Sequence, residues 1–137
     1  MTALVDTGFL LALFNVRDRY QKPAVQLVKS ESKSLIIPAP VFPELFYMMS
    51  ERTGYRDAMR ALDELAHSDY RIEPLLQADM RRMSEIMKLY EDARFDFVDV
   101  SIMALSERLN ITRICTFDRR DFPIFRPAHC DSLELLP

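Results

Sequence analysis

The sequence is poor in the features that mark disulfide-rich, membrane-spanning and glycine-loop proteins. Its 137 residues include two cysteines, too few for a disulfide framework. It has only two glycines, Gly8 and Gly54, so a Walker loop and a dinucleotide-binding fingerprint are both missing. No apolar run approaches the roughly 20 residues of a membrane span, and no basic leader region precedes Asp6. We therefore expect a cytoplasmic protein that does not associate with a membrane.

The charge balance also lacks a basic excess. The chain carries 18 Lys and Arg against 21 Asp and Glu, a formal net charge of −3. This argues against a protein that holds nucleic acid through bulk positive charge. It does not exclude a nuclease, because an acidic metal pocket lowers the net charge while arginines gather elsewhere. Apolar residues make up 49% of the chain, enough for a substantial core.

The apolar pattern predicts short strands that alternate with helices. Strands are expected at 3–5, 35–37, 113–117 and 132–135 and within 70–75, and helices at 7–14, 20–30, 40–52, 56–67, 77–91 and 97–109. This alternation predicts an α/β fold with a central, mainly parallel sheet covered by helices. In such a sheet, ligands bind beyond the carboxyl ends of the strands.

Four acidic residues fall at the ends of these elements. Asp6 and Asp118 directly follow predicted strands, and Asp99 lies at the start of a helix. Glu44 lies early in a helix that is apolar on nearly all sides, which we expect to be buried. These ends should converge at one rim of the sheet. Carboxylates gathered there would repel one another unless a divalent cation joined them, and an all-oxygen ligand set favours Mg²⁺, with Mn²⁺ as the alternative.

Each acid also has a purely structural explanation. Asp6 can cap the helix that follows it, and Asp96 can cap the next acidic helix with Asp99 in its first turn. Glu44 can interact with a helix dipole. Asp118 and Asp121 can belong to a solvated turn with weak Asp–Arg pairs. The shared position of the set, rather than any single member, favours a site.

The two cysteines have separate interpretations. Cys115 lies in an apolar run and is expected to be a small core residue. Cys130 follows His129, so a Cys/His metal site is conceivable there. Neither a Cys-x-x-Cys spacing nor further ligands accompany the pair.

Four segments resemble PIN domains, in particular the ribonuclease toxins of bacterial toxin–antitoxin pairs of the VapC type. They are residues 4–14, 37–45, 96–109 and 111–122. The most specific part combines an aspartate that opens a helix (Asp99) with an aspartate after a strand (Asp118), followed by Arg-Arg-Asp-Phe. The resemblance implies a PIN-like three-layer α/β/α architecture and a single PIN domain over residues 1–137.

The resemblance also implies the site. It places metal-binding catalytic carboxylates at Asp6, Glu44, Asp99 and Asp118. The supporting residues are Thr7, Asp96, Thr116 and Asp121. Three positions depart from the family pattern: Gly8 replaces a usual serine or asparagine, Val100 replaces an alanine, and Pro43 precedes Glu44. None of these departures removes a carboxylate.

The implied activity is magnesium-dependent hydrolysis of RNA phosphodiester bonds by a toxin of a type II toxin–antitoxin system. The implied partners are an RNA substrate, a cognate antitoxin protein and a second copy in a homodimer. Basic residues near the first and last motifs are candidates for RNA-backbone contacts, with a solvated face as the alternative for each. They are Arg17, Arg19, Lys22, Arg119, Arg120 and Arg126.

Two other functions compete with this one. A non-catalytic RNA- or protein-binding module would not need the complete set of acids. An aspartate-based phosphatase would need Asp-x-Asp at the first strand, where Gly8 stands instead. A receiver domain would need a lysine after a late strand, and the nearest cation is Arg119. The acids therefore favour the nuclease.

Overall fold

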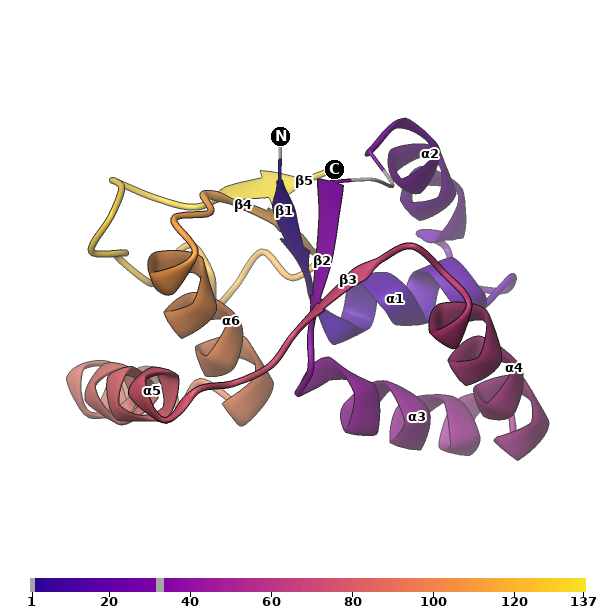
Figure 1. Cartoon of the computed structure of the whole chain (residues 1–137), viewed down its shortest axis with the longest axis horizontal. Coiled ribbons are helices and arrows are strands. Elements are labelled where there is room, and N and C mark those ends of the chain that lie inside the picture. The colour runs from indigo at the N-terminus through magenta and orange to yellow at the C-terminus, as the bar shows by residue number, and fades with distance from the viewer. Residues whose placement is uncertain (1, 32–33) are drawn as a thin grey trace.

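The computed structural model describes residues 2–31 and 34–137. A five-stranded sheet, parallel throughout, forms its centre, with strand order β3-β2-β1-β4-β5 (Figure 1). The strands are β1 (Ala3–Val5), β2 (Leu35–Pro38), β3 (Arg71–Glu73), β4 (Arg113–Cys115) and β5 (Glu134–Leu136). The predicted parallel sheet is confirmed, and β5 is an edge strand as expected.

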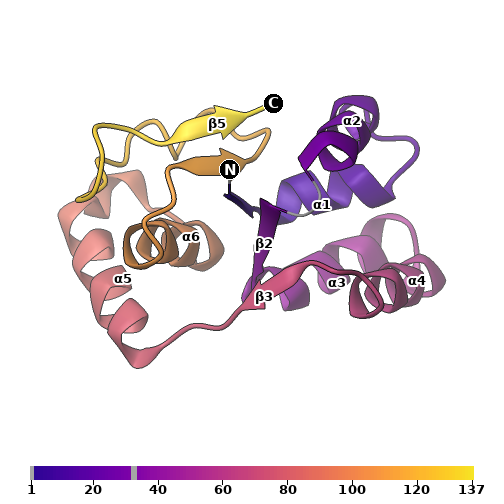
Figure 2. The ribbon, with the colours of Figure 1, turned by 45° about the horizontal axis from the view of Figure 1, so that its top comes forward.

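Helices cover both faces of this sheet, as Figures 1 and 2 show. One layer holds α1 (Thr7–Phe14), α2 (Gln21–Glu31), α3 (Val41–Arg52) and α4 (Tyr55–Ala66). The other holds α5 (Gln77–Leu89) and α6 (Phe97–Arg108), joined by the short 3-10 helix η2 (Glu91–Ala93). The predicted three-layer α/β/α architecture is therefore confirmed. None of the described helices is long and apolar enough to cross a membrane.

The central strands are short, apolar and buried on both faces. Leu4 of β1 pairs with Ile36 of β2 on one side and with Ile114 of β4 on the other. All three side chains are buried, as expected for a parallel sheet covered by helices on both sides. Cys115 is buried beside them, which confirms its expected place in the core. This rigid centre sets the positions of the loops that follow β1 and β4.

Several element boundaries differ from the prediction. Pro38 continues β2 and pairs with Glu73 of β3, rather than stopping the strand. The strand predicted at 113–117 ends at Cys115, so the residues that follow form a loop. The helix predicted to reach Glu91 ends at Leu89.

The expectation that the helix containing Glu44 is buried on nearly all sides is wrong. In α3, Val41, Leu45 and Met49 form a buried stripe at helical spacing, whereas Tyr47 is 65% exposed. The reason is tertiary: α3 packs against α1 and α4 and touches β2, and solvent covers its remaining face. Glu44 itself is half-buried.

Candidate active site

Asp6 links the end of β1 to the start of α1. One carboxylate oxygen accepts a hydrogen bond from the backbone N–H of Phe9 at 2.8 Å, so the predicted N-cap is confirmed. The other oxygen accepts a hydrogen bond from the Thr116 hydroxyl. Asp6 is only 5% exposed. A cap alone needs neither this burial nor a second partner from another strand.

Thr116 joins the loops that follow two neighbouring strands. It lies directly after β4 and is buried. Its hydroxyl donates to Asp6 and accepts a hydrogen bond from the backbone N–H of Asp118 at 2.9 Å. The single hydroxyl therefore fixes the first acidic segment relative to the last one.

Asp99 is held in the first turn of α6. The carboxylate of Asp96 accepts a hydrogen bond from the backbone N–H of Asp99 at 2.8 Å, so Asp96 is the N-cap as predicted. Asp99 is therefore not needed to cap the helix, and its side chain is free to face the loop after β4.

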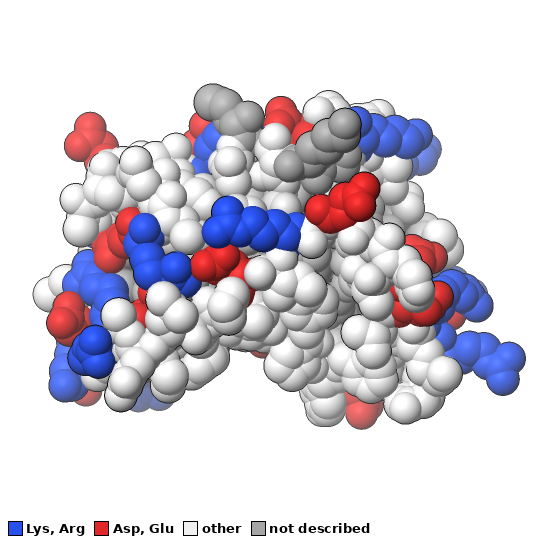
Figure 3. Space-filling model, in the orientation of Figure 1, with Lys and Arg blue, Asp and Glu red and all other residues white. Residues whose placement is uncertain are grey.

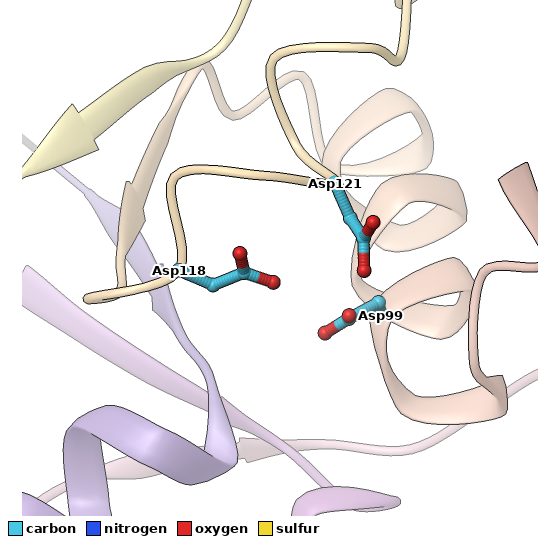
Figure 4. Close-up of side chains that lie close together, drawn as sticks. All are labelled: Asp99, Asp118 and Asp121. Atoms are coloured by element: carbon cyan, nitrogen blue, oxygen red, sulfur yellow. The ribbon is translucent and has the colours of Figure 1, made fainter.

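Three carboxylates converge there. Asp99, Asp118 and Asp121 each place one oxygen within 4.8 Å of the others. Figure 4 shows that Asp99 comes from α6 and the other two come from the loop, with their side chains pointing toward one another. The expected turn contacts also exist, because the Asp118 carboxylate accepts from the N–H of Arg120 at 2.8 Å and Arg120 lies 3.5 Å from Asp121. Local turn geometry and convergence with Asp99 thus occur together.

Asp6 and Glu44 lie outside this tight group but act on the same region. Glu44 lies in the first turn of α3. The starts of α1, α3 and α6 lie at one end of the sheet (Figure 1), where the outline of the molecule is indented (Figure 3). The charges of Asp118 and Glu44 both raise the pKa of Asp6. All four predicted carboxylates therefore share an electrostatic neighbourhood, and Asp121 joins them.

Burial and mutual repulsion raise the pKa values of two of these acids, so that they lose their protons at a higher pH than an ordinary aspartate. Burial, followed by the charges of Asp96, Asp6, Asp118 and Asp121, raises the pKa of Asp99 to about 8. Burial is also the main cause that raises the pKa of Asp6 to about 6, against the opposing hydrogen bonds from Thr116 and Phe9. Fully ionised, the group would be unstable without a cation.

The donor chemistry fits a hard divalent cation. The group offers carboxylate oxygens and neither sulfur nor imidazole, the ligand set that suits Mg²⁺ or Mn²⁺. The buried Thr7 hydroxyl, in the first motif, has no hydrogen-bond partner among the described residues. No second group of three potential ligands occurs in residues 2–31 and 34–137. The conceivable Cys130–His129 site gains no support, because no group of three potential ligands that includes this pair occurs among the described residues.

Comparison with known proteins agrees with this geometry. The sequence profile of the PIN domain family matches residues 3–126. The chain belongs to the PIN domain family. A curated relative, ribonuclease VapC26 of Mycobacterium tuberculosis, is 26% identical over 134 residues, covering 98% of this chain and 99% of that protein.

Solved structures share the fold of this PIN domain. VapC20 of Mycobacterium tuberculosis, described as a toxin that cleaves the sarcin–ricin loop, gives a TM-score of 0.79 at 23% identity, covering 85% of this chain and 90% of that one. VapBC2 of Rickettsia felis, bound to a promoter DNA fragment, gives 0.71 at 17% identity, covering 98% and 97%. A toxin–antitoxin complex from Klebsiella pneumoniae gives 0.64 at 21% identity, covering 88% and 90%.

The basic candidates of this PIN domain occupy different environments. Arg119 donates to the carbonyl oxygens of Thr116 at 2.8 Å and Pro137 at 2.7 Å, and Arg126 donates to the Pro123 carbonyl at 2.6 Å. These two guanidinium groups therefore brace the backbone. All six basic candidates are exposed; the four besides Arg119 and Arg126 are Arg17, Arg19, Lys22 and Arg120. On the face shown in Figure 3, positive and negative side chains are interspersed.

Sequence reasoning did not identify one feature beside the site of the PIN domain. Three aromatic rings, Phe9, Phe117 and Tyr20, stack on one another between α1, the loop after β4 and the start of α2. They are 11 or more positions apart in the sequence, so no local spacing could reveal them. The clue available was that Phe9 and Phe117 each lie close in sequence to a predicted metal ligand, Asp6 and Asp118.

Proposed function

We propose that this PIN domain, over residues 1–137, is a metal-dependent endoribonuclease that hydrolyses RNA phosphodiester bonds with Mg²⁺, or Mn²⁺ in its place. The convergence of Asp99, Asp118 and Asp121 beside Asp6 and Glu44 carries this proposal. The curated relative named a ribonuclease supports it. A hydrolysis site needs a cation that can be shared with a phosphate, and the acids offer several oxygens to hold one.

In this proposal Asp6, Glu44, Asp99 and Asp118 hold the metal, and Asp121 supports them. A cation held by these residues would activate water for attack on the phosphate and would offset the charge of the phosphate. The rest of the chain orients these ligands. The Phe9 N–H and the Thr116 hydroxyl hold both oxygens of Asp6, and the same hydroxyl holds the backbone at Asp118. Asp96 caps α6 and thereby keeps Asp99 in its first turn.

The biological role proposed here is that of a cytoplasmic toxin in a type II toxin–antitoxin pair. Its partners would be a cognate antitoxin protein and a second copy of the chain in a homodimer. The names of the structural neighbours, which include two toxin–antitoxin assemblies, support an antitoxin partner. The exposed cations Arg17, Arg19, Lys22 and Arg120 are the candidates for RNA-backbone contacts.

Expression in a bacterial host tests this function. We expect the wild type to arrest growth and to create defined new RNA 5′ ends, and Asp6→Asn to do neither. Equal cleavage by both proteins would remove Asp6 from the mechanism. Purified protein that still cleaves RNA after exhaustive chelation would contradict the metal dependence. Growth arrest by both proteins without new RNA ends would favour the non-catalytic binding module instead.

A further inference from the structure

A stack of flat groups runs from the core to the surface beside the acidic site. The rings of Phe9 and Phe117 are nearly parallel, with centroids 5.6 Å apart and planes inclined by 13°. Tyr20 stacks on Phe117 at 4.4 Å and 8°. The guanidinium carbon of Arg19 lies 4.7 Å from the centre of the Tyr20 ring. Phe9 is fully buried, Phe117 and Tyr20 are half-buried, and Arg19 is exposed.

The stack is built on the backbone of the site itself. Phe9 supplies the N–H that holds Asp6, and Phe117 lies between Thr116 and Asp118 in the chain. The outer layer is therefore positioned relative to the acids by the two inner rings. The backbone at Tyr20 is also held in place, because its N–H donates to the Asp18 carboxylate at 2.8 Å.

The face of the Tyr20 ring that Phe117 does not occupy carries an exposed side chain, Arg19. Phe117 occupies one face of the ring, so the Arg19 guanidinium must lie over the opposite face. A cation on an aromatic ring at an exposed site contributes only about 0.5–1 kcal/mol. A planar group that stacks more strongly can therefore displace it. Stacking of a nucleobase on an aromatic side chain contributes about 1–3 kcal/mol per base, whatever the identity of the base.

We infer that Tyr20 is a base-stacking subsite, at which an unpaired RNA base near the scissile phosphate displaces Arg19 and continues the stack. The displaced guanidinium remains beside the strand and can contact a phosphate. Bases in a duplex are already stacked on their neighbours, so the subsite selects single-stranded segments or loops. This inference rests on the proposed ribonuclease function, and it adds a substrate feature that the acids alone do not define.

The absence of tryptophan from the chain makes a direct test available. Tyr20→Trp introduces a single tryptophan that keeps an aromatic ring in the stack. Tyr55→Trp, on α4 at a position 63% exposed, is the matched control. Both are made with Asp99→Asn, which prevents cleavage during the measurement. The probes are a short mixed-sequence single-stranded RNA and a sugar-phosphate chain of equal length that lacks bases, each labelled for a separate anisotropy measurement of binding.

We expect the RNA to quench the fluorescence of Tyr20→Trp and the chain without bases to leave it unchanged, with no quenching of Tyr55→Trp by either. We also expect Tyr20→Leu to weaken RNA binding about tenfold and to leave binding of the chain without bases unchanged. RNA binding without quenching of Tyr20→Trp would overturn the stacking subsite and leave the nuclease proposal intact. A wild type that neither binds nor cleaves RNA would overturn both.

Discussion

Acidic side chains at the two ends of helix α6 lie in opposite electrostatic environments. At its N-terminal end, Asp99 faces two other carboxylates, Asp118 and Asp121. At its C-terminal end, Glu107 and Arg108 each face groups of opposite charge. The same helix therefore carries one region where charge is left uncompensated and one where it is balanced.

The balanced end is tied together by arginine–carboxylate pairs. Arg82 Nε lies 2.6 Å from Glu107, and Arg108 donates to Asp79 at 2.8 Å. Arg108 also lies 3.1 Å from Glu73. Asp79 and Glu73 are buried, and buried charges persist when they are paired. These pairs connect α5, α6 and β3.

The pKa values of the acids differ between the two ends of α6 in the same way. Burial and neighbouring carboxylates raise the pKa of Asp99 to about 8. Burial would also raise the pKa of Glu107, but hydrogen bonds from Arg82 and the Ala128 N–H outweigh it and leave that pKa below its usual value. Acids paired with arginines across the fold stabilise it, whereas Asp99 faces other carboxylates and is available for a cation from outside. This contrast separates the site from the scaffold.

The largest expected effect is on catalysis at the uncompensated end. Asp99→Asn should lower RNA cleavage by at least about a thousandfold, a loss typical of a group that acts on the transition state. Its fold should be intact, because the change removes repulsion. Cleavage assays and urea unfolding in chelator check both parts. A variant that is inactive because it is unfolded would not support the account.

The balanced end should respond in stability instead. Asp79→Asn removes one of the two buried carboxylates that pair with Arg108 and weakens the hydrogen bond from the Leu76 N–H, which is 2.8 Å long. We expect a loss of about 2–3 kcal/mol in the free energy of unfolding, measured in urea. Cleavage per folded molecule should stay close to that of the wild type. A large loss of cleavage by folded Asp79→Asn would contradict the assignment of catalysis to one end of α6 and of stability to the other.

Divalent cations should stabilise the protein only through the uncompensated end. Mg²⁺ at about ten times its dissociation constant adds about 1.4 kcal/mol, or about 5 °C in Tm for a chain of this size. Thermal unfolding with and without Mg²⁺ checks this. The shift should persist in Asp79→Asn and vanish in Asp99→Asn. An equal shift in all three proteins would assign the effect to another site.

A further expected effect is a pH dependence of the stability of the metal-free protein. Asp99 and Asp6 have pKa values of about 8 and about 6 when folded, both above the ordinary value of 3.8. The folded state therefore holds protons that the unfolded chain has released. Their stabilising contribution is fully present below about pH 4 and is lost as the pH rises through about 6 and about 8. Urea unfolding in chelator should show this decline, and Asp99→Asn should flatten it between about pH 6 and about pH 8.

The features of the fold and the site that depend on neighbouring residues can be predicted from the sequence. Helix periodicity and the caps Asp6 and Asp96 depend on neighbours within four residues, and both caps are confirmed. The central strands β1 and β2 can be located because they are continuous apolar runs. The carboxyl-end rule for parallel sheets then directed attention to the residues that follow them.

The remainder depends on contacts between distant segments. Arg108 and Asp79 are 29 positions apart, so nothing in the local sequence separates a paired acid from an unpaired one. The resemblance gives Asp121 only a supporting role, yet the loop places it within the acidic group. The exposure of Tyr47 was missed because it depends on which helices cover α3.

Direct measurement of cation binding tests the central claim, that the carboxylates converging on Asp99 form a metal site. Calorimetric titration with Mn²⁺ near pH 8 should show saturable binding by the wild type and by Asp79→Asn, and none by Asp99→Asn. Undiminished binding by Asp99→Asn, or no binding by the wild type, would contradict the account.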